Sequence, residues 1–208
     1  MESQKIKKEF SNAIVLTGGI ASGKSSVCSL LSLYGFQVID ADKTAHRLLD
    51  ENRIKIVRMF GKEYVDGEKV DRKKLGSLVF EDETQRKKLE ALLHPLIKER
   101  LIERSRLCES KNIPYILEIP LFFEKRNYAV DETVVVYCKK EQQIQRLLKR
   151  ENFTLQEVRS RLNAQMSLDE KKELASYVID NTKDLKHLQA EVDKFISYIK
   201  EKYPNIRL

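Results

Sequence analysis

Short β-branched runs alternate along the chain with stretches in which apolar residues recur at helical spacing. The runs are almost continuously apolar and are bounded by turn residues or charges, which is typical of strands buried on both faces. Such strands, alternating with helices, form a parallel sheet covered on both sides. We therefore expect a three-layer α/β fold around a five-stranded parallel sheet, with strands at residues 13–17, 37–40, 115–119, 133–138 and 177–180.

The stretch between the second and third expected strands is far longer than the ~10 to 12 residues that a crossover requires. It contains a helical segment at 71–80 and a longer amphipathic segment at 84–107. Pro95 lies inside the longer segment and should kink or divide it. We expect residues 43–109 to form a helical insertion.

A second helical stretch, residues 141–174, follows the fourth expected strand. Thr154 and Glu157 match a capping box, so one helix should end near Asn152 and another begin after Thr154. A last helix at 184–200 should cover the sheet. The chain of 208 residues then forms one unit with two insertions, and its core comprises residues 11–42, 110–140 and 175–208.

The composition favours a cytosolic protein. Cys28, Cys108 and Cys138 are far apart and form no C-x-x-C pair, which favours reduced thiols over disulfides or a zinc site. The first ten residues lack the apolar core of a signal peptide, and no apolar run approaches the ~18 residues of a membrane span. We therefore expect no membrane partner.

The net charge of +7 and the pI near 9.2 are compatible with a nucleic acid or with an anionic small molecule. Basic residues are scattered with acidic residues between them, and a contiguous basic face with interleaved aromatics is not apparent. A small anionic ligand is therefore expected, and no nucleic acid. A nucleotide-switched nucleic-acid-binding protein is the alternative from another class.

The segment LTGGIASGKSS matches the phosphate-binding pattern G-x-x-x-x-G-K-[ST], between an expected strand and a helical segment at 24–34. Glycines let backbone N–H groups converge on an anion, and the helix N-terminus adds partial positive charge. We expect Lys24 to reach the β- and γ-phosphates of a nucleotide and Ser25 to bind Mg²⁺. The expected nucleotide-binding residues are Gly18, Gly19, Ile20, Ala21, Ser22, Gly23, Lys24, Ser25 and Ser26.

A phosphate-binding loop indicates a nucleotide but leaves the reaction open among GTPases, ATP-driven motors and small-molecule kinases. The segment NTKD at 181–184 has the residue types of a guanine-reading tetrad but the wrong spacing, which disfavours a GTPase. Glu118 ends the third expected strand, where such folds place a partner of Mg²⁺. The alternative is that Glu118 is a solvated strand-terminal residue.

A pair of acidic residues follows the second expected strand in the segment VIDAD. Asp40 and Asp42 would share a face if this segment stays extended, at the carboxyl edge of the sheet. A carboxylate there could orient or deprotonate a hydroxyl that attacks the γ-phosphate. Alternatively, Asp42 only caps a helix that begins at Lys43.

Several blocks of the chain together resemble the dephospho-coenzyme A kinase family, in that family's order and approximate spacing. They cover nearly the full length and read LTGGIASGKSS, VIDADKTAHRLL, VDRKKLGSLVF, LEALLHPLI, EIPLFFE, QRLLKRENFT and YVIDN. Departures from residues frequent in the family, at Ala21, Glu118, Phe122 and Ser176, leave Lys24, Ser25 and Asp42 untouched.

The resemblance implies a P-loop nucleotide-kinase-like core, with residues 43–109 as an acceptor-binding domain and 141–174 as a mobile lid. It implies ATP-dependent phosphorylation, with Mg²⁺, of the ribose 3′-hydroxyl of dephospho-coenzyme A, the last step of coenzyme A synthesis. By position, Asp42 is similar to the family's catalytic carboxylate, and Lys24 and Ser25 keep the loop roles given above. A nucleoside monophosphate kinase is the nearest rival, but an adenylate-reading Asp-Gly-Phe-Pro-Arg-like segment is not seen.

The resemblance also implies acceptor contacts. His94 and Pro95 match a His-Pro of the acceptor domain, and Pro120, Leu121 and Glu124 match a segment that lines the same cleft. Without the resemblance to this family, we would interpret His94 as a core histidine that is hydrogen-bonded to backbone.

Lid arginines are the last implied contacts. Arg146 and Arg150 share one helical face and would close over the triphosphate, excluding water. For each of them, an exposed structural salt bridge is the alternative.

Overall fold

The computed structural model describes residues 9–125, 127–150 and 153–204, apart from the side chain of Arg150. The chain divides into two compact units. One unit comprises the described residues up to Ile39 and from Ser105 onward, and the other is Asp40–Arg104. The acceptor-binding and lid roles expected for 43–109 and 141–174 stay predictions.

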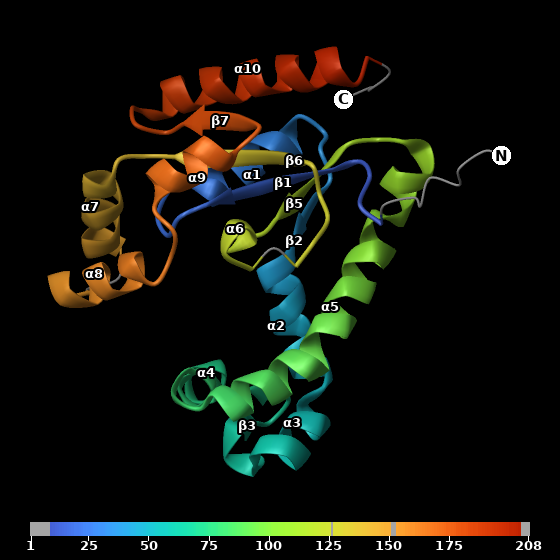
Figure 1. Ribbon diagram of the computed structural model, residues 1–208, viewed down its shortest axis with the longest axis vertical. Helices are drawn as coiled ribbons and strands as arrows, with labels where there is room; N and C mark the ends of the chain where they lie inside the picture. Colours follow the sequence, from blue (N-terminus) through green and yellow to red (C-terminus); the bar gives the residue numbers. More distant parts are fainter. Residues whose placement is uncertain (1–8, 126, 151–152, 205–208) are drawn as a thin grey trace. The chain divides into compact units, whose positions relative to one another are not determined.

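The first unit is built on a five-stranded sheet, which confirms the predicted α/β fold (Figure 1). Its strand order is β2-β5-β1-β6-β7, and β1 pairs in parallel with both β5 and β6. The loop after the central strand β1 lies at the carboxyl edge of the sheet, which is where folds of this kind bind their ligands. The strands are β1 (Ala13–Gly18), β2 (Val38–Asp40), β5 (Tyr115–Glu118), β6 (Glu132–Tyr137) and β7 (Tyr177–Asp180).

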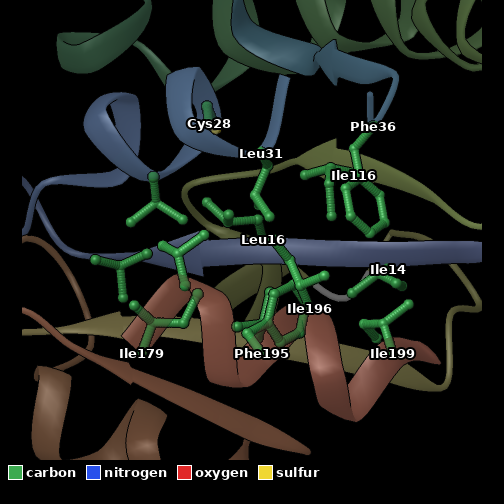
Figure 2. Close-up of a cluster of buried hydrophobic side chains, with 14 of the residues drawn as sticks. Ile14, Leu16, Cys28, Leu31, Phe36, Ile116, Ile179, Phe195, Ile196 and Ile199 are labelled. Carbon is green, nitrogen blue, oxygen red and sulfur yellow. The ribbon is translucent and has the colours of Figure 1, made fainter. Parts of the chain in front are cut away.

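Helices α1 (Lys24–Leu33) and α10 (Leu185–Lys202) pack their apolar faces on one side of this sheet (Figure 2). Ile14 and Leu16 of β1 point into that cluster, so Val15 between them points to the opposite side. Val15 is also fully buried, and the sheet is therefore covered on both faces, as three layers require.

Four further helices of the first unit follow β5 and β6. Both α8 and α9 begin with capping boxes: the predicted pair Thr154 and Glu157, and a second pair, Ser167 and Glu170, that the sequence analysis overlooked. In each box the serine or threonine accepts a backbone N–H and the glutamate reaches back. The helices are α6 (Phe122–Lys125), α7 (Lys140–Arg150), α8 (Leu155–Asn163) and α9 (Leu168–Leu174).

The second unit has its own apolar cluster, centred on Leu48, Ile56 and Leu75. Its helices are α2 (Ala41–Glu51), α3 (Arg53–Phe60), the short 3-10 helix η1 (Lys62–Tyr64), α4 (Arg72–Glu81) and the first part of α5 (Glu83–Lys111).

Two expectations for this stretch were wrong. The insertion is not purely helical, because β3 (Val65–Asp66) and β4 (Lys69–Val70) form an antiparallel hairpin. Gly67 adopts φ 57° in its turn, so the dipeptide Asp-Gly at 66–67 was the signal that sequence analysis passed over. Nor does Pro95 divide the long helix, which runs continuously as α5. The other half of that expectation, a kink at Pro95, stays a prediction.

Among the described residues, no helix is long and apolar enough to cross a membrane.

Candidate active site

The phosphate-binding loop joins β1 to α1 and has a backbone that requires glycine at two positions. Gly23 has φ 101°, in the left-handed region that side chains disfavour. An added Cβ on Gly18 would lie 2.9 Å from the backbone carbonyl oxygen of Val136. The loop therefore keeps its shape only with bare backbone at these places.

The N-terminus of α1 is left open toward an anion. Gly23 is the N-cap residue and supplies no side-chain hydrogen bond to the first turn. The first N–H groups of a helix lack intrahelical partners and carry partial positive charge, so they can bind phosphate. Lys24 begins the helix, and its ammonium group reaches back to the carbonyl oxygen of Gly19 at 3.0 Å.

Side chains from distant parts of the chain hold the loop by its peptide groups. Nε2 of Gln143 donates to the carbonyl of Ile20 at 2.7 Å, and the N–H of Ile20 donates to Oε1 of Gln165 at 2.9 Å. Nδ2 of Asn181 donates to the carbonyl of Ser22 at 2.8 Å. In a planar trans peptide the C=O and N–H point oppositely, so the N–H groups of the following residues turn away from these clamps.

Arg146 of α7 also contacts the loop. Its Nη1 donates to the carbonyls of Ala21 and Ser22 at 3.2 and 3.3 Å, and its Nη2 donates to the carbonyl of Asn181 at 3.0 Å. These contacts are to backbone and not to a carboxylate, so the cation beside the loop remains unneutralised by them. Arg146 thus brings a positive charge to the loop from α7.

A pocket of about 500 Å³ opens beside the loop. Lys24, Arg146 and Lys183 bring positive charge to it, which suits an anionic ligand. The remaining lining residues are Ala21, Ser22, Gly23, Ser25, Ser26, Glu118, Asn181, Asp184, Leu185 and Leu188.

Ser25 and Glu118 both line this pocket and are the only expected metal ligands. One carboxylate oxygen of Glu118 accepts a hydrogen bond from the Cys28 thiol at 3.3 Å, which orients the carboxylate. In the described part of the chain, no group of three or more His, Cys, Asp or Glu residues could hold a metal. A hydroxyl and one carboxylate fit Mg²⁺, which is held by few protein ligands and by substrate phosphates.

The segment after β5 is held to β1 and to α9 by hydrogen bonds and an ion pair. The Thr17 hydroxyl donates to the carbonyl of Pro120 at 3.0 Å. Oε1 of Glu124 accepts from the backbone N–H of Met166 at 3.1 Å and pairs with the ammonium of Lys171 at 2.8 Å. The structure thus connects the predicted Pro120, Leu121 and Glu124 to the same unit as the loop.

Asp42 lies in the second unit, where the capping interpretation is wrong. The N-cap of α2 is Asp40, whose carboxylate accepts the backbone N–H of Lys43 at 2.8 Å. Asp42 lies in the first helical turn and is exposed. The premise that both aspartates share the face of an extended segment is therefore also wrong, because the strand ends at Asp40.

The other predicted residues divide as follows. His94 and Pro95 are exposed on α5 of the second unit, so the core-histidine interpretation of His94 is wrong. The side chain of Arg150 lies outside the residues that the structure describes.

Four residues that contact the loop or its neighbours were not predicted from the sequence: Gln143, Gln165, Lys171 and Asn181. For Asn181 a signal was available, because it comes directly after an expected strand.

Comparison with known proteins gives consistent results. A family model described as dephospho-CoA kinase matches residues 12–187. The chain is 50% identical to a dephospho-CoA kinase of Sulfurimonas denitrificans, over 93% of this chain and 97% of that protein. It is 44% identical to the dephospho-CoA kinase of Wolinella succinogenes, over 92% and 96%. A solved dephospho-CoA kinase from Campylobacter jejuni superposes with a TM-score of 0.72 at 33% identity, covering 93% and 99%.

Proposed function

The chain belongs to the dephospho-CoA kinase family, and from this premise we propose how its residues carry out the reaction. Dephospho-CoA kinase activity, the final step of CoA biosynthesis, comes with the family. We propose that the γ-phosphoryl group of ATP is transferred to the ribose 3′-hydroxyl of dephospho-CoA, giving ADP and CoA. The observation that carries this proposal is the clamped loop with Lys24 and Ser25 at one pocket.

The donor triphosphate would occupy the pocket beside the loop. Phosphoryl transfer passes through a loose transition state, so positioning and electrostatic stabilisation supply most of the rate. The loop amides and Lys24 hold the β- and γ-phosphates, and Arg146 adds a cation on the side of α7. Arg150, predicted to join Arg146, keeps that role as a proposal.

Ser25 and Glu118 would hold Mg²⁺ with the nucleotide phosphates. When bound, the ion neutralises part of the triphosphate charge. The bond from the Cys28 thiol orients the carboxylate of Glu118, which would bind a magnesium-bound water.

The acceptor hydroxyl would be oriented by Asp42, which accepts its proton or aligns it for attack. Because Asp40 already caps α2, the carboxylate of Asp42 is not used for capping. His94, Pro95, Pro120, Leu121 and Glu124 are proposed as acceptor contacts. The cytosolic placement also stays a prediction.

The test is a substrate panel with the purified chain. ATP and GTP are crossed with dephospho-CoA and nucleoside monophosphates in the presence of Mg²⁺, and the position of the new phosphate is read by ³¹P NMR. We expect ATP and dephospho-CoA to give ADP and 3′-phosphorylated product. Rapid turnover of a monophosphate without turnover of dephospho-CoA, or a phosphate on another hydroxyl, would contradict the proposal.

A further inference from the structure

Lys171 of α9 is a fully buried lysine that none of the roles above uses. Its ammonium nitrogen lies 2.8 Å from Oε1 of Glu124, 3.0 Å from the carbonyl of Pro120 and 3.3 Å from the carbonyl of Gly18. An ammonium group has three N–H donors, and here three acceptors surround it.

The three acceptors come from different places in the fold. Gly18 opens the phosphate-binding loop, Pro120 follows β5, and Glu124 lies on α6. Burying a lysine costs free energy even when it is paired, and an apolar residue of similar volume often stabilises a core as well or better. A three-way bond of this kind is therefore better explained by the geometry it imposes than by stability.

We propose that Lys171 is a positioning residue that fixes the spacing between the phosphate-binding loop and the segment 120–124. This rests on the proposed function, in which that segment contacts the acceptor. Through Lys171, the donor side and the acceptor side of the transfer are held to one ammonium group.

The helix that carries Lys171 is itself well anchored. Its N-terminus is closed by the capping box of Ser167 and Glu170, and Leu168 is buried. The N–H of Met166, just before it, donates to Glu124 at 3.1 Å. The helix α9 falls within the residues predicted as the lid, but these contacts attach it to the unit that contains the sheet. The backbone of Lys171 is therefore held in place.

Loss of Lys171 should affect the segment 120–124 more than the phosphate-binding loop. The loop keeps its clamps from Gln143, Arg146 and Asn181. The segment 120–124 loses two bonds at once, those to Pro120 and Glu124. We therefore expect the acceptor to be misplaced while the nucleotide still binds.

The experiment compares Lys171→Met with Lys172→Met, the same substitution at an exposed neighbour on α9. For Lys171→Met we expect kcat/KM for dephospho-CoA to fall about 100-fold. The Kd for ADP, measured by calorimetry, should stay within about threefold of wild type. Lys172→Met should behave as wild type. Unchanged kinetics in Lys171→Met, or equal losses of ADP affinity and transfer, would overturn the inference.

A double-mutant cycle with Glu124→Gln separates positioning from charge neutralisation. If Lys171 only neutralises Glu124, then Lys171→Met has no further effect once Glu124 is uncharged. If Lys171 positions the two carbonyls as well, Lys171→Met still lowers kcat/KM in the Glu124→Gln background. The first result overturns the proposal and the second supports it.

Thr17→Val keeps the inference testable if Lys171→Met does not fold. Thr17 also donates to the carbonyl of Pro120 and is fully buried, and valine has nearly its shape. We expect a smaller fall in kcat/KM for dephospho-CoA, again with ADP affinity retained; no fall would overturn the inference. Failure of the proposed function would instead appear in the wild-type chain, as absence of 3′-phosphorylation.

Discussion

Asn181 donates from its side-chain amide to the carbonyl oxygen of Ser22 at 2.8 Å, which binds the end of β7 to the phosphate-binding loop. Asn181 is buried, and its own carbonyl accepts from Arg146. One residue thus connects the loop to the arginine that reaches it from α7.

We predict that Asn181→Asp weakens nucleotide binding. The change keeps the size of the side chain but removes the donor to Ser22 and places negative charge beside the expected triphosphate. The Kd for ATP should rise by about 10- to 100-fold, measured by calorimetry well below the Tm, which should itself fall because a buried carboxylate then faces the carbonyl oxygen of Ser22. The matched control is Asn127→Asp, at an exposed position away from the pocket. Equal Kd values for the two variants would exclude this role of Asn181.

Ala21 provides a prediction about stability. It adopts φ 58°, a left-handed conformation that costs a residue with a Cβ about 1 to 2 kcal/mol. Glycine removes this cost but adds about 0.5 to 1 kcal/mol of unfolded-state entropy. Ala21→Gly should therefore raise the free energy of unfolding by about 0.5 to 1 kcal/mol, measured by urea titration.

Ala164→Gly is the control, for which we expect the opposite change in the free energy of unfolding. Ala164 lies at the C-cap of α8 with φ −78° and ψ −4°, which alanine adopts without strain. Glycine there should lower the free energy of unfolding by about 0.5 to 1 kcal/mol. If both variants are destabilised equally, the left-handed strain at Ala21 is not relieved by glycine.

Much of the fold could be predicted from the sequence because burial on both faces leaves a strong local pattern. The five strands, the loop and the capping box at Thr154 all depend on residues close in the chain. The hairpin around Gly67 had a local signal too, but its two strands are only two residues long, too short for periodicity to show.

The rest of the site depends on contacts between residues far apart in sequence. Lys171 and Gln165 are polar residues near the start of a short helix, where solvent exposure is the ordinary expectation. Only the fold brings their partners, Gly18 and Ile20, beside them. The start of α2 was misplaced for a simpler reason: Asp40 and Asp42 are equally good capping residues, and the sequence pattern does not choose between them.

Tyr137 allows the attachment of α9 to be tested by pH. Its hydroxyl donates to Oδ1 of Asp169 at 2.8 Å, and this bond, together with burial, raises the pKa of the phenol to about 12. Because the folded pKa lies above the unfolded value near 10, the associated stability is present below about pH 10 and is lost as the pH rises through about 12.

Asp169→Asn should move the Tyr137 pKa back toward 10, since the bond to a carboxylate is lost. The shift can be followed by ¹³C NMR of labelled tyrosine, with Tyr137→Phe to identify the resonance. The variant should also lose less stability between pH 10 and 12 than the wild type. A Tyr137 titration unaffected by Asp169→Asn would mean that α9 is not held to β6 in this way.

Asp42→Asn is the sharpest test of the proposed mechanism. Asparagine keeps the size of the side chain but cannot accept a proton, so general-base or charge-based orientation of the hydroxyl is lost. We predict that kcat falls by about 10²- to 10⁴-fold, measured by coupled ADP release. The Kd for ATP should change little, because phosphate binding is assigned to the loop and Lys24.

Asp40→Ala is the control that separates catalysis from capping. Asp40 caps α2 by accepting the N–H of Lys43, so its loss should lower the free energy of unfolding by about 1 kcal/mol. Asp42→Asn should lower that free energy less, since Asp42 is not the cap. The two variants should thus lose different properties: stability at position 40 and turnover at position 42. Near-normal turnover in Asp42→Asn would remove the carboxylate from the mechanism, because its neighbour already explains the helix start.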